Sequence, residues 1–154
     1  MSSKVADFTE LTRVTMMGAD DFWLYFQSED GLTDYKVAKS SIFPIPSTPA
    51  QITSSQNNYV ISNDADVFRI STDASRNITG IAGGWDGRKI KIINVGSFQL
   101  NLVHQSGSSN AANRIIMDSS LDANIAANSV VDLIYDGTTS RWRLTYGSYN
   151  VAYS

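Results

Sequence analysis

The sequence predicts an all-β protein: an antiparallel β-sandwich or barrel, jelly-roll-like, carried behind an N-terminal anchoring segment. Short alternations of apolar and polar residues recur from Tyr59 onward at roughly ten-residue spacing, as in sandwiches and barrels. Turn residues stand between them, and no run of ordinary helical length and period follows Asn58. A hydrophobic fraction of 42% is enough for a real core.

The alternation is clearest in three stretches, Lys89–Ile92, Phe98–His104 and Arg141–Tyr146. Each places apolar side chains at every second position, as a half-buried strand does. Asp136-Gly137 stands between two such runs and is a strong hairpin signal. We therefore expect one β-domain over residues 59–154. Its predicted core comprises Phe68, Ile90, Ile92, Leu100, Leu102, Leu133, Trp142 and Leu144.

Residues 1–43 are interpreted as a separate anchoring segment. The apolar run Phe22–Phe26, a turn over Ser28–Thr33 and the stretch Asp34–Ala38 predict a hairpin. Because an isolated hairpin is marginal in water, this one is expected to pack on something else. Consecutive apolar residues also place apolar side chains on both faces of a strand, and an exposed apolar patch marks an interaction site.

All three prolines of the chain, Pro44, Pro46 and Pro49, fall directly after this segment, and a polar stretch follows them. Clustered prolines favour extended, semi-rigid backbone. Residues 44–58 are therefore predicted to be a linker arm between the anchoring segment and the β-domain.

Charge and composition exclude several classes. Residues 1–43 carry four basic and seven acidic side chains, so the whole net charge of −3 lies there. Without a basic stripe, nucleic acid is not an expected partner. The chain has no cysteine, which excludes disulfides and cysteine metal sites. It has no apolar run of membrane-spanning length and no signal-peptide pattern at its start, so no membrane partner is expected.

No catalytic or cofactor motif is found. The single histidine, His104, is expected to be a hydrogen-bonded residue at a strand end, because no nucleophile elbow accompanies it. Asn63–Asp66 has the look of a calcium-loop start but lacks the rest of that pattern, so a solvated turn is predicted. The glycine-rich stretch Gly83–Lys89 lacks the spacing of a phosphate loop. The chain is therefore predicted to be no enzyme and to bind neither cofactor nor metal.

Two stretches resemble bacteriophage structural proteins. The first, Val5–Ile42, resembles the opening of tail-fibre, head-fibre and related virion proteins through Phe8–Thr12, Ala19–Asp21, Gly31–Thr33 and Tyr35–Ala38. The second, Ile78–Leu144, is similar to a β-rich module of phage fibre and decoration proteins through Ile81, Gly87–Arg88, Ile92–Gly96, Leu100–His104, Ser109–Arg114, Tyr135–Thr138 and Arg141–Leu144. The run Phe22–Phe26 is more aromatic than this pattern.

The resemblance implies a structural protein on the surface of a phage particle, assembled in the host cytoplasm as a homotrimer. The first hypothesis is a capsid decoration protein, of the cement or head-fibre kind, with the major capsid protein as its partner. The alternative is a short tail-fibre or baseplate appendage that binds a host receptor, with a host glycan as a further partner. The candidate attachment and interface residues are Phe22, Trp23, Leu24, Tyr25, Phe26, Tyr35, Phe43, Pro44, Pro46 and Pro49.

Overall fold

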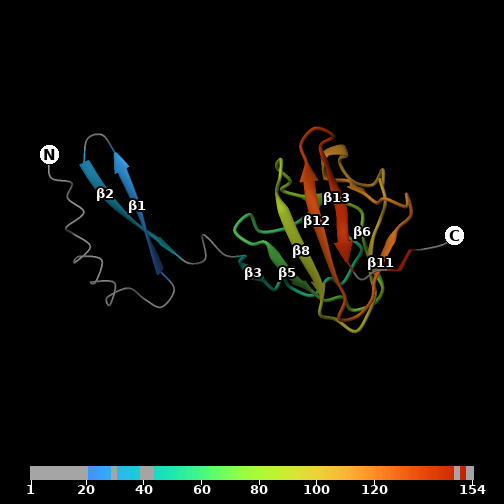
Figure 1. Cartoon of the computed structure of the whole chain (residues 1–154). Coiled ribbons are helices and arrows are strands. Elements are labelled where there is room, and N and C mark those ends of the chain that lie inside the picture. Colours follow the sequence, from blue (N-terminus) through green and yellow to red (C-terminus); the bar gives the residue numbers. More distant parts are fainter. Residues whose placement is uncertain (1–20, 29–30, 39–43, 148–149, 152–154) are drawn as a thin grey trace. The chain divides into compact units, whose positions relative to one another are not determined.

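The chain divides into two compact units, Met1–Pro44 and Ile45–Ser154 (Figure 1). The computed structural model describes residues 21–28, 31–38, 44–147 and 150–151. Within the first unit, strands β1 (Asp21–Ser28) and β2 (Gly31–Ala38) form an antiparallel hairpin that confirms the predicted one. Its register pairs Ser28 with Gly31 at the turn and Asp21 with Ala38 at the open end.

The second unit is a stack of rungs, in which the chain passes repeatedly over its own previous turn. Residues 46–60, 67–82 and 89–104 are the first, second and third rungs. The first contains β3 (Pro46–Ser47) and β4 (Tyr59–Val60); the second contains β5 (Val67–Ile70), β6 (Arg76–Ile78) and β7 (Ile81–Ala82); the third contains β8 (Lys89–Asn94) and β9 (Leu100–Leu102).

These three rungs stack in parallel. The second rung lies on the first through the pairs Pro46↔Val67 and Tyr59↔Ile81, with single bridges Ile52↔Thr72 and Gln56↔Ile78 between them. The third rung lies on the second along β5–β8 and β6–β9. Parallel pairing of successive turns of one chain defines a β-solenoid.

The rest of the chain continues the stack but reverses its direction. Strands β11 (Ala123–Ile125) and β12 (Val130–Asp136) run antiparallel on β9 and β8 of the third rung. Strands β13 (Arg141–Gly147) and β14 (Asn150–Val151) then run antiparallel on β12 and β11. A short 3-10 turn, η4 (Ala111–Asn113), leads into β10 (Ile115–Ile116), which pairs in parallel with β13.

Two sheets result, and both contain the rungs in the same order. The six-stranded sheet runs β10-β13-β12-β8-β5-β3, and the four-stranded sheet runs β14-β11-β9-β6. The labelled strands β8, β12 and β13 lie side by side in Figure 1. A small pair, β4–β7, forms a short third side.

The all-β prediction is confirmed, but the predicted antiparallel sandwich or barrel is wrong. Alternation shows that a strand has one buried face and says nothing about the direction of its neighbours. The rungs also carry no repeated sequence motif, because residues stacked at the same position differ in type. Phe68, for example, pairs with Ser47 on one side and with Ile92 on the other. The offset between paired residues changes as well, from 20 at Ile52↔Thr72 to 24 at Phe68↔Ile92.

The stretch 44–58, predicted to be a linker arm, is built into the second unit from Ile45 onward. Ile52 is only 4% exposed and belongs to the core. Its N–H donates to the Ser71 carbonyl (2.9 Å), and its own carbonyl accepts from the Asp73 N–H (3.1 Å). Proline clusters favour extended backbone, and both a linker and a first rung consist of extended backbone. The prolines therefore could not distinguish between the two.

The core runs through the inside of all the rungs. Seven of the eight predicted core residues are at most 2% exposed, and the eighth, Leu144, is half-buried against them. Trp142 is fully buried, packs edge-to-face on Tyr135 with ring centroids 5.3 Å apart, and donates its indole N–H to the Ile81 carbonyl (2.8 Å). This contact ties β13 to the second rung, so the reversed rungs and the parallel rungs close one interior.

Candidate functional site

The outer face of the six-stranded sheet carries most of the positive charge of the second unit. The register places Lys89 and Arg143 on either side of Ile134, and Lys91 beside Asp132. Because directly paired residues share a face, these side chains lie together on the outside, while their strand neighbours fill the core. We call this surface the basic face; its charged residues are Arg69, Lys89, Lys91, Arg141, Arg143, Asp132 and Asp136.

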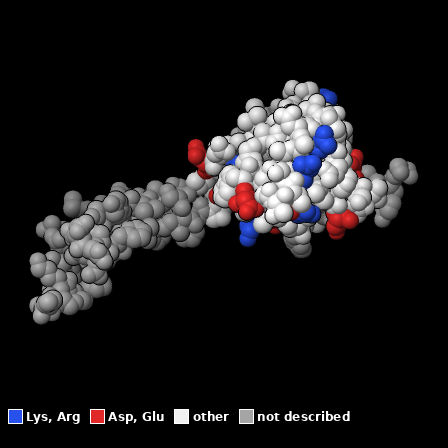
Figure 2. Space-filling model, turned by 90° about the horizontal axis from the view of Figure 1, so that it is seen from above, with Lys and Arg blue, Asp and Glu red and all other residues white. Residues whose placement is uncertain are grey.

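The basic face has a net charge of +3, from five cations and two carboxylates. The other charged residues of 45–154 are three arginines and six aspartates, so they carry −3. The unit is therefore neutral in total but strongly polarised. Figure 2 shows Lys and Arg atoms in a band across the visible surface, with acidic atoms toward its margins.

Both carboxylates of the basic face are already paired. Lys91 binds Asp132 across neighbouring strands, and the Arg143 Nε lies 2.8 Å from Asp136. In the part of the chain that the structure describes, Arg69, Lys89 and Arg141 form no ion pair with a carboxylate. Three cations on one exposed face are thus available to an external anion.

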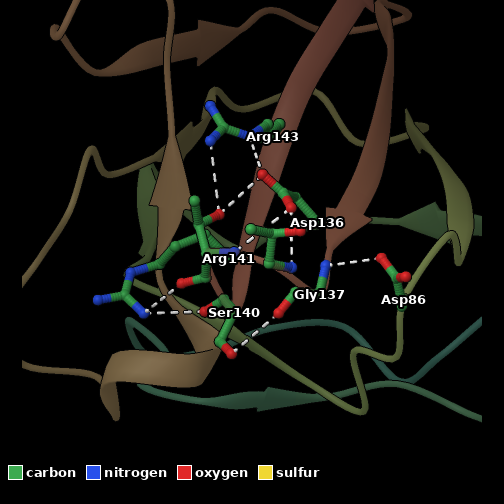
Figure 3. Close-up of polar contacts among 8 residues, drawn as sticks. Asp86, Asp136, Gly137, Ser140, Arg141 and Arg143 are labelled. Carbon is green, nitrogen blue, oxygen red and sulfur yellow. Dashed lines mark hydrogen bonds and ion pairs between the residues drawn. The ribbon is translucent and has the colours of Figure 1, made fainter.

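One end of this face is organised by Asp136, the last residue of β12 (Figure 3). Its carboxylate accepts hydrogen bonds from the Thr138 N–H (3.0 Å), the Thr139 hydroxyl (2.9 Å) and the Arg143 Nε (2.8 Å). The bonds from Arg143 and then Thr139 lower the pKa of Asp136 below its ordinary value. The β12–β13 turn is therefore held in one shape by a carboxylate that stays ionised.

Arg141 is fixed beside this turn. Its Nη1 donates to the carbonyls of Ser140 (2.8 Å) and Thr139 (3.3 Å), and its Nε donates to Gln105 Oε1 (3.2 Å). These acceptors are neutral, so they orient the guanidinium without cancelling its charge. Figure 3 shows the side chain extending away from Asp136, on the far side of the turn from Asp86.

The loop before β8 reaches the same end and displays Trp85, whose side chain is 61% exposed. The loop is braced on both sides of this residue. Asp86 accepts from the Gly137 N–H (2.8 Å), and the Gly87 N–H donates to the Tyr135 carbonyl (3.0 Å). Gly84 lies so close to the Tyr135 ring that a Cβ there would be 2.1 Å from it.

A buried arginine, Arg88, anchors the end of this loop and is 2% exposed. Its guanidinium donates to the carbonyls of Ser62 (2.6 Å), Ala65 (3.3 Å) and Gly83, and to Asn63 Oδ1 (3.2 Å). Burial lowers the pKa of Arg88, partly offset by the charge of Asp66. The acidic-looking stretch Asn63–Asp66 is thus a turn wrapped around this cation, in keeping with the predicted turn.

The outer face of the four-stranded sheet is uncharged at its centre. Asn77, Asn101 and Asn124 stand in register on β6, β9 and β11. The Asn101 Nδ2 donates to Asn77 Oδ1 (2.9 Å), and Gln99 Nε2 donates to Asn101 Oδ1 (2.7 Å). We call this row the amide face. The bond from Asn101 to Asn77 joins the third rung to the second and so supports the stack.

His104 lies at a strand end and is hydrogen-bonded, as expected. Its Nδ1 accepts from the Met117 N–H (3.0 Å), and its own N–H donates to Asp122 (2.7 Å). Ser109 instead bonds to Thr79 (2.7 Å) and to the Asn58 N–H (3.0 Å). Within the described residues, no three His, Asp or Glu side chains gather as a metal ion would require.

The sequence-predicted attachment residues fall into two groups. Phe22, Trp23, Leu24, Tyr25 and Phe26 all lie in β1, and Tyr35 pairs with Leu24 from β2. Phe43 lies outside the described residues. Pro44, the last residue of the first unit, is exposed. At the beginning of the second unit, Pro46 is exposed and Pro49 is half-buried.

Sequence reasoning missed the basic face because it summed the charge of the C-terminal part to zero. A signal was present: Lys89-Ile90-Lys91 and Arg141-Trp142-Arg143 each place two cations on the same side of a strand. Only the register shows that both pairs point outward from one sheet.

The chain matches no protein-family model, and no curated protein is significantly similar to it in sequence. None of the described residues forms a helix long and apolar enough to cross a membrane.

Proposed function

We propose that this chain is a non-enzymatic structural protein of a bacteriophage particle, in which the N-terminal unit attaches and the solenoid is displayed. The observation that carries the proposal is a difference between the two units: residues 45–154 contain a buried hydrophobic core, whereas the described part of the first unit is a two-stranded hairpin. A hairpin alone is marginal in water, so it needs a partner surface.

The hairpin's register supports an attachment role. Phe22, Leu24 and Phe26 occupy alternate positions of β1, and their cross-strand partners are Val37, Tyr35 and Thr33. Alternate positions share one face of a strand, so five of these six positions on one side of the hairpin are apolar. Such a side gains by contact with another apolar surface, and the major capsid protein is the partner that we propose.

Capsid decoration is the first form of this proposal. A specific observation also favours the second form, a tail-fibre or baseplate appendage that binds a host receptor. The basic face and the braced Trp85 loop present unpaired cations and an exposed indole on rigid elements, as a recognition surface does.

The test separates attachment from folding. Particles lacking the chain are mixed with the full chain or with residues 45–154, and bound protein is measured after sedimentation. Residues 45–154 should keep the circular dichroism and cooperative unfolding of a folded domain but should not co-sediment. A second variant, Leu24→Asp in the full chain, should also fail to bind. Co-sedimentation of residues 45–154 at the level of the full chain would refute the assignment, and cryo-EM of labelled particles distinguishes capsid from tail.

A homotrimer is part of the same proposal. Its physical basis is the aromatic strand Phe22–Phe26, which offers apolar residues at successive positions. Analytical ultracentrifugation of the full chain over a dilution series should give three times the monomer mass, and Leu24→Asp should lower it. A monomer at every concentration would contradict self-assembly in solution.

A further inference from the structure

We propose that the Trp85 end of the basic face binds a carboxylate-bearing polysaccharide, such as a polymer of uronic or sialic acid. The inference rests on the proposed function, because it requires the solenoid to be the displayed part. It concerns a ligand of the solenoid and not the attachment surface of the hairpin, so ligand binding and attachment can be tested separately.

The cations are spaced for a ligand that runs across strands. Lys89 begins β8, Ile134 lies beside it on β12, and Arg143 follows on β13. Neighbouring strands are about 4.8 Å apart, which separates the Cα atoms of Lys89 and Arg143 by about 10 Å. Arg141 lies two residues before Arg143, about 7 Å along the same strand face.

Arg141 is the residue suited to a carboxylate. Its Nε and Nη1 already donate to three neutral oxygens, which leaves the N–H groups of Nη2 to donate to a carboxylate oxygen. The same three bonds hold the Arg141 guanidinium in place, so little side-chain entropy is lost when an anion binds. Arg143 is committed to Asp136, and its role here is to keep the turn in shape.

Trp85 supplies the apolar platform. An exposed indole can cover the C–H face of a sugar ring, and its N–H can donate to a hydroxyl. The loop that carries it is fixed by Arg88, by Asp86 and by the contact of Gly84 with Tyr135, so the indole is presented on a rigid support. Hydroxyls of the adjacent turn, including Thr139, complete a polar rim.

Charge density favours a polysaccharide over nucleic acid. Duplex DNA carries about one charge per 1.7 Å of axis, and tight binding rests on roughly six or more phosphate contacts. The basic face has three unpaired cations, and the other charged residues of the unit, which include Asp86 at the same end, sum to −3 and repel such a polyanion. Carboxylated polysaccharides carry fewer charges per unit length than duplex DNA, so three unpaired cations are enough to match them.

A protein partner fits less well. Interface cores are depleted in charge and enriched in exposed apolar side chains. On the basic face the apolar residues Val67, Ile93 and Ile134 are half-buried between long charged side chains. Among the described residues, only two large apolar residues, Trp85 and Val60, are more than half exposed.

The experiment is affinity electrophoresis of the full chain in native gels that contain polygalacturonate, polysialic acid or hyaluronate. The matched neutral probe is fully methyl-esterified polygalacturonate, which keeps the backbone and removes the charge. We expect retardation in at least one acidic gel, weakening as salt is raised, and none in the ester gel. The double variant Lys89→Gln/Arg141→Gln, and separately Trp85→Ala, should bind roughly tenfold or more weakly.

Two matched controls lie elsewhere on the unit. Arg76→Gln removes a cation from the four-stranded sheet, and Phe98→Ala removes a second exposed aromatic ring of the described residues, which is 47% exposed. Both should bind as the unaltered chain does. The inference is overturned if no acidic gel retards the chain, if the ester retards it equally, or if single-stranded DNA retards it more strongly through the same residues. Particle co-sedimentation of Trp85→Ala should stay normal, which separates this result from the proposed attachment.

Discussion

The six-stranded and four-stranded sheets enclose one core, yet their outer faces use polar residues in opposite ways. On the amide face, Asn101 bonds to its neighbours Asn77 and Gln99. On the basic face, Lys89 forms no described polar contact, and Arg141 keeps its full charge among neutral acceptors. Amide side chains that hydrogen-bond to one another stabilise the stacked rungs. Cationic side chains without a carboxylate partner can instead bind an anionic ligand. Four experiments test this difference between the two faces.

The largest expected effect is on stability, and it tests whether the inner faces of the two sheets contribute equally to the core. Leu102 faces the core from the four-stranded sheet and Leu133 from the six-stranded sheet, with exposures of 0% and 1%. Leu→Ala at either position should lower the free energy of unfolding by about 2–5 kcal/mol. Urea denaturation measures this, with Val60→Ala at an exposed position as control. A cost at only one position would mean that the sheets do not share one core.

The amide face provides the next test. Asn101→Ala removes the bonds to Asn77 Oδ1 and Ser75 Oγ and leaves the Gln99 amide without its acceptor. Because these groups are exposed and can bond to water instead, we expect a loss of about 1 kcal/mol in stability. Polysaccharide retardation should not change. Lys89→Gln should do the reverse, with unchanged stability and weaker retardation, and any overlap of the two effects would weaken the contrast.

A third test uses pH. The pKa of Asp136 is lowered by Arg143, so its ion pair stabilises the fold fully above the ordinary aspartate value of 3.8. That contribution is lost as the pH falls through the lower folded value. Asp73, whose pKa is lowered by Arg76, behaves in the same way on the second rung. Denaturation midpoints from about pH 6 down to about pH 3 should fall less steeply for Asp136→Asn than for the unaltered chain. Identical slopes would show that the pair is not formed in solution.

The smallest effect concerns a buried hydroxyl between the sheets. Thr72 is 1% exposed, and its Oγ1 has no hydrogen-bond partner among the described residues. Thr72→Val keeps the shape and removes the unpaired group, so stability should stay the same or rise by up to about 1 kcal/mol. Thr79→Val is the matched control, because that hydroxyl bonds to Ser109 and Asn57, and it should destabilise. A loss at Thr72 equal to that at Thr79 would point to a missed partner.

The sequence predicted the strands and their buried residues, since alternation reports the burial of Phe68, Ile92 or Leu102 directly. It could not predict how the strands stack. The pair Val67↔Lys91 joins residues 24 apart and Pro46↔Val67 joins residues 21 apart, with no shared motif at either. Parallel stacking depends on which rung covers which, and that is decided by packing across the whole interior. The same limit hid the basic face, whose residues come together only through register.

The proline cluster lies at the open edge of the six-stranded sheet and not in a linker. Strand β3, which holds Pro46, is the edge of the six-stranded sheet, and Pro44 precedes it in the chain. An exposed parallel edge is a template on which another chain can grow, and a solenoid edge is already shaped to accept a further rung. Proline has no backbone N–H, so a chain pairing with this edge would lack a hydrogen-bond donor at each proline. Copies crowded at high local density would then stay separate and would not polymerise end to end into fibrils.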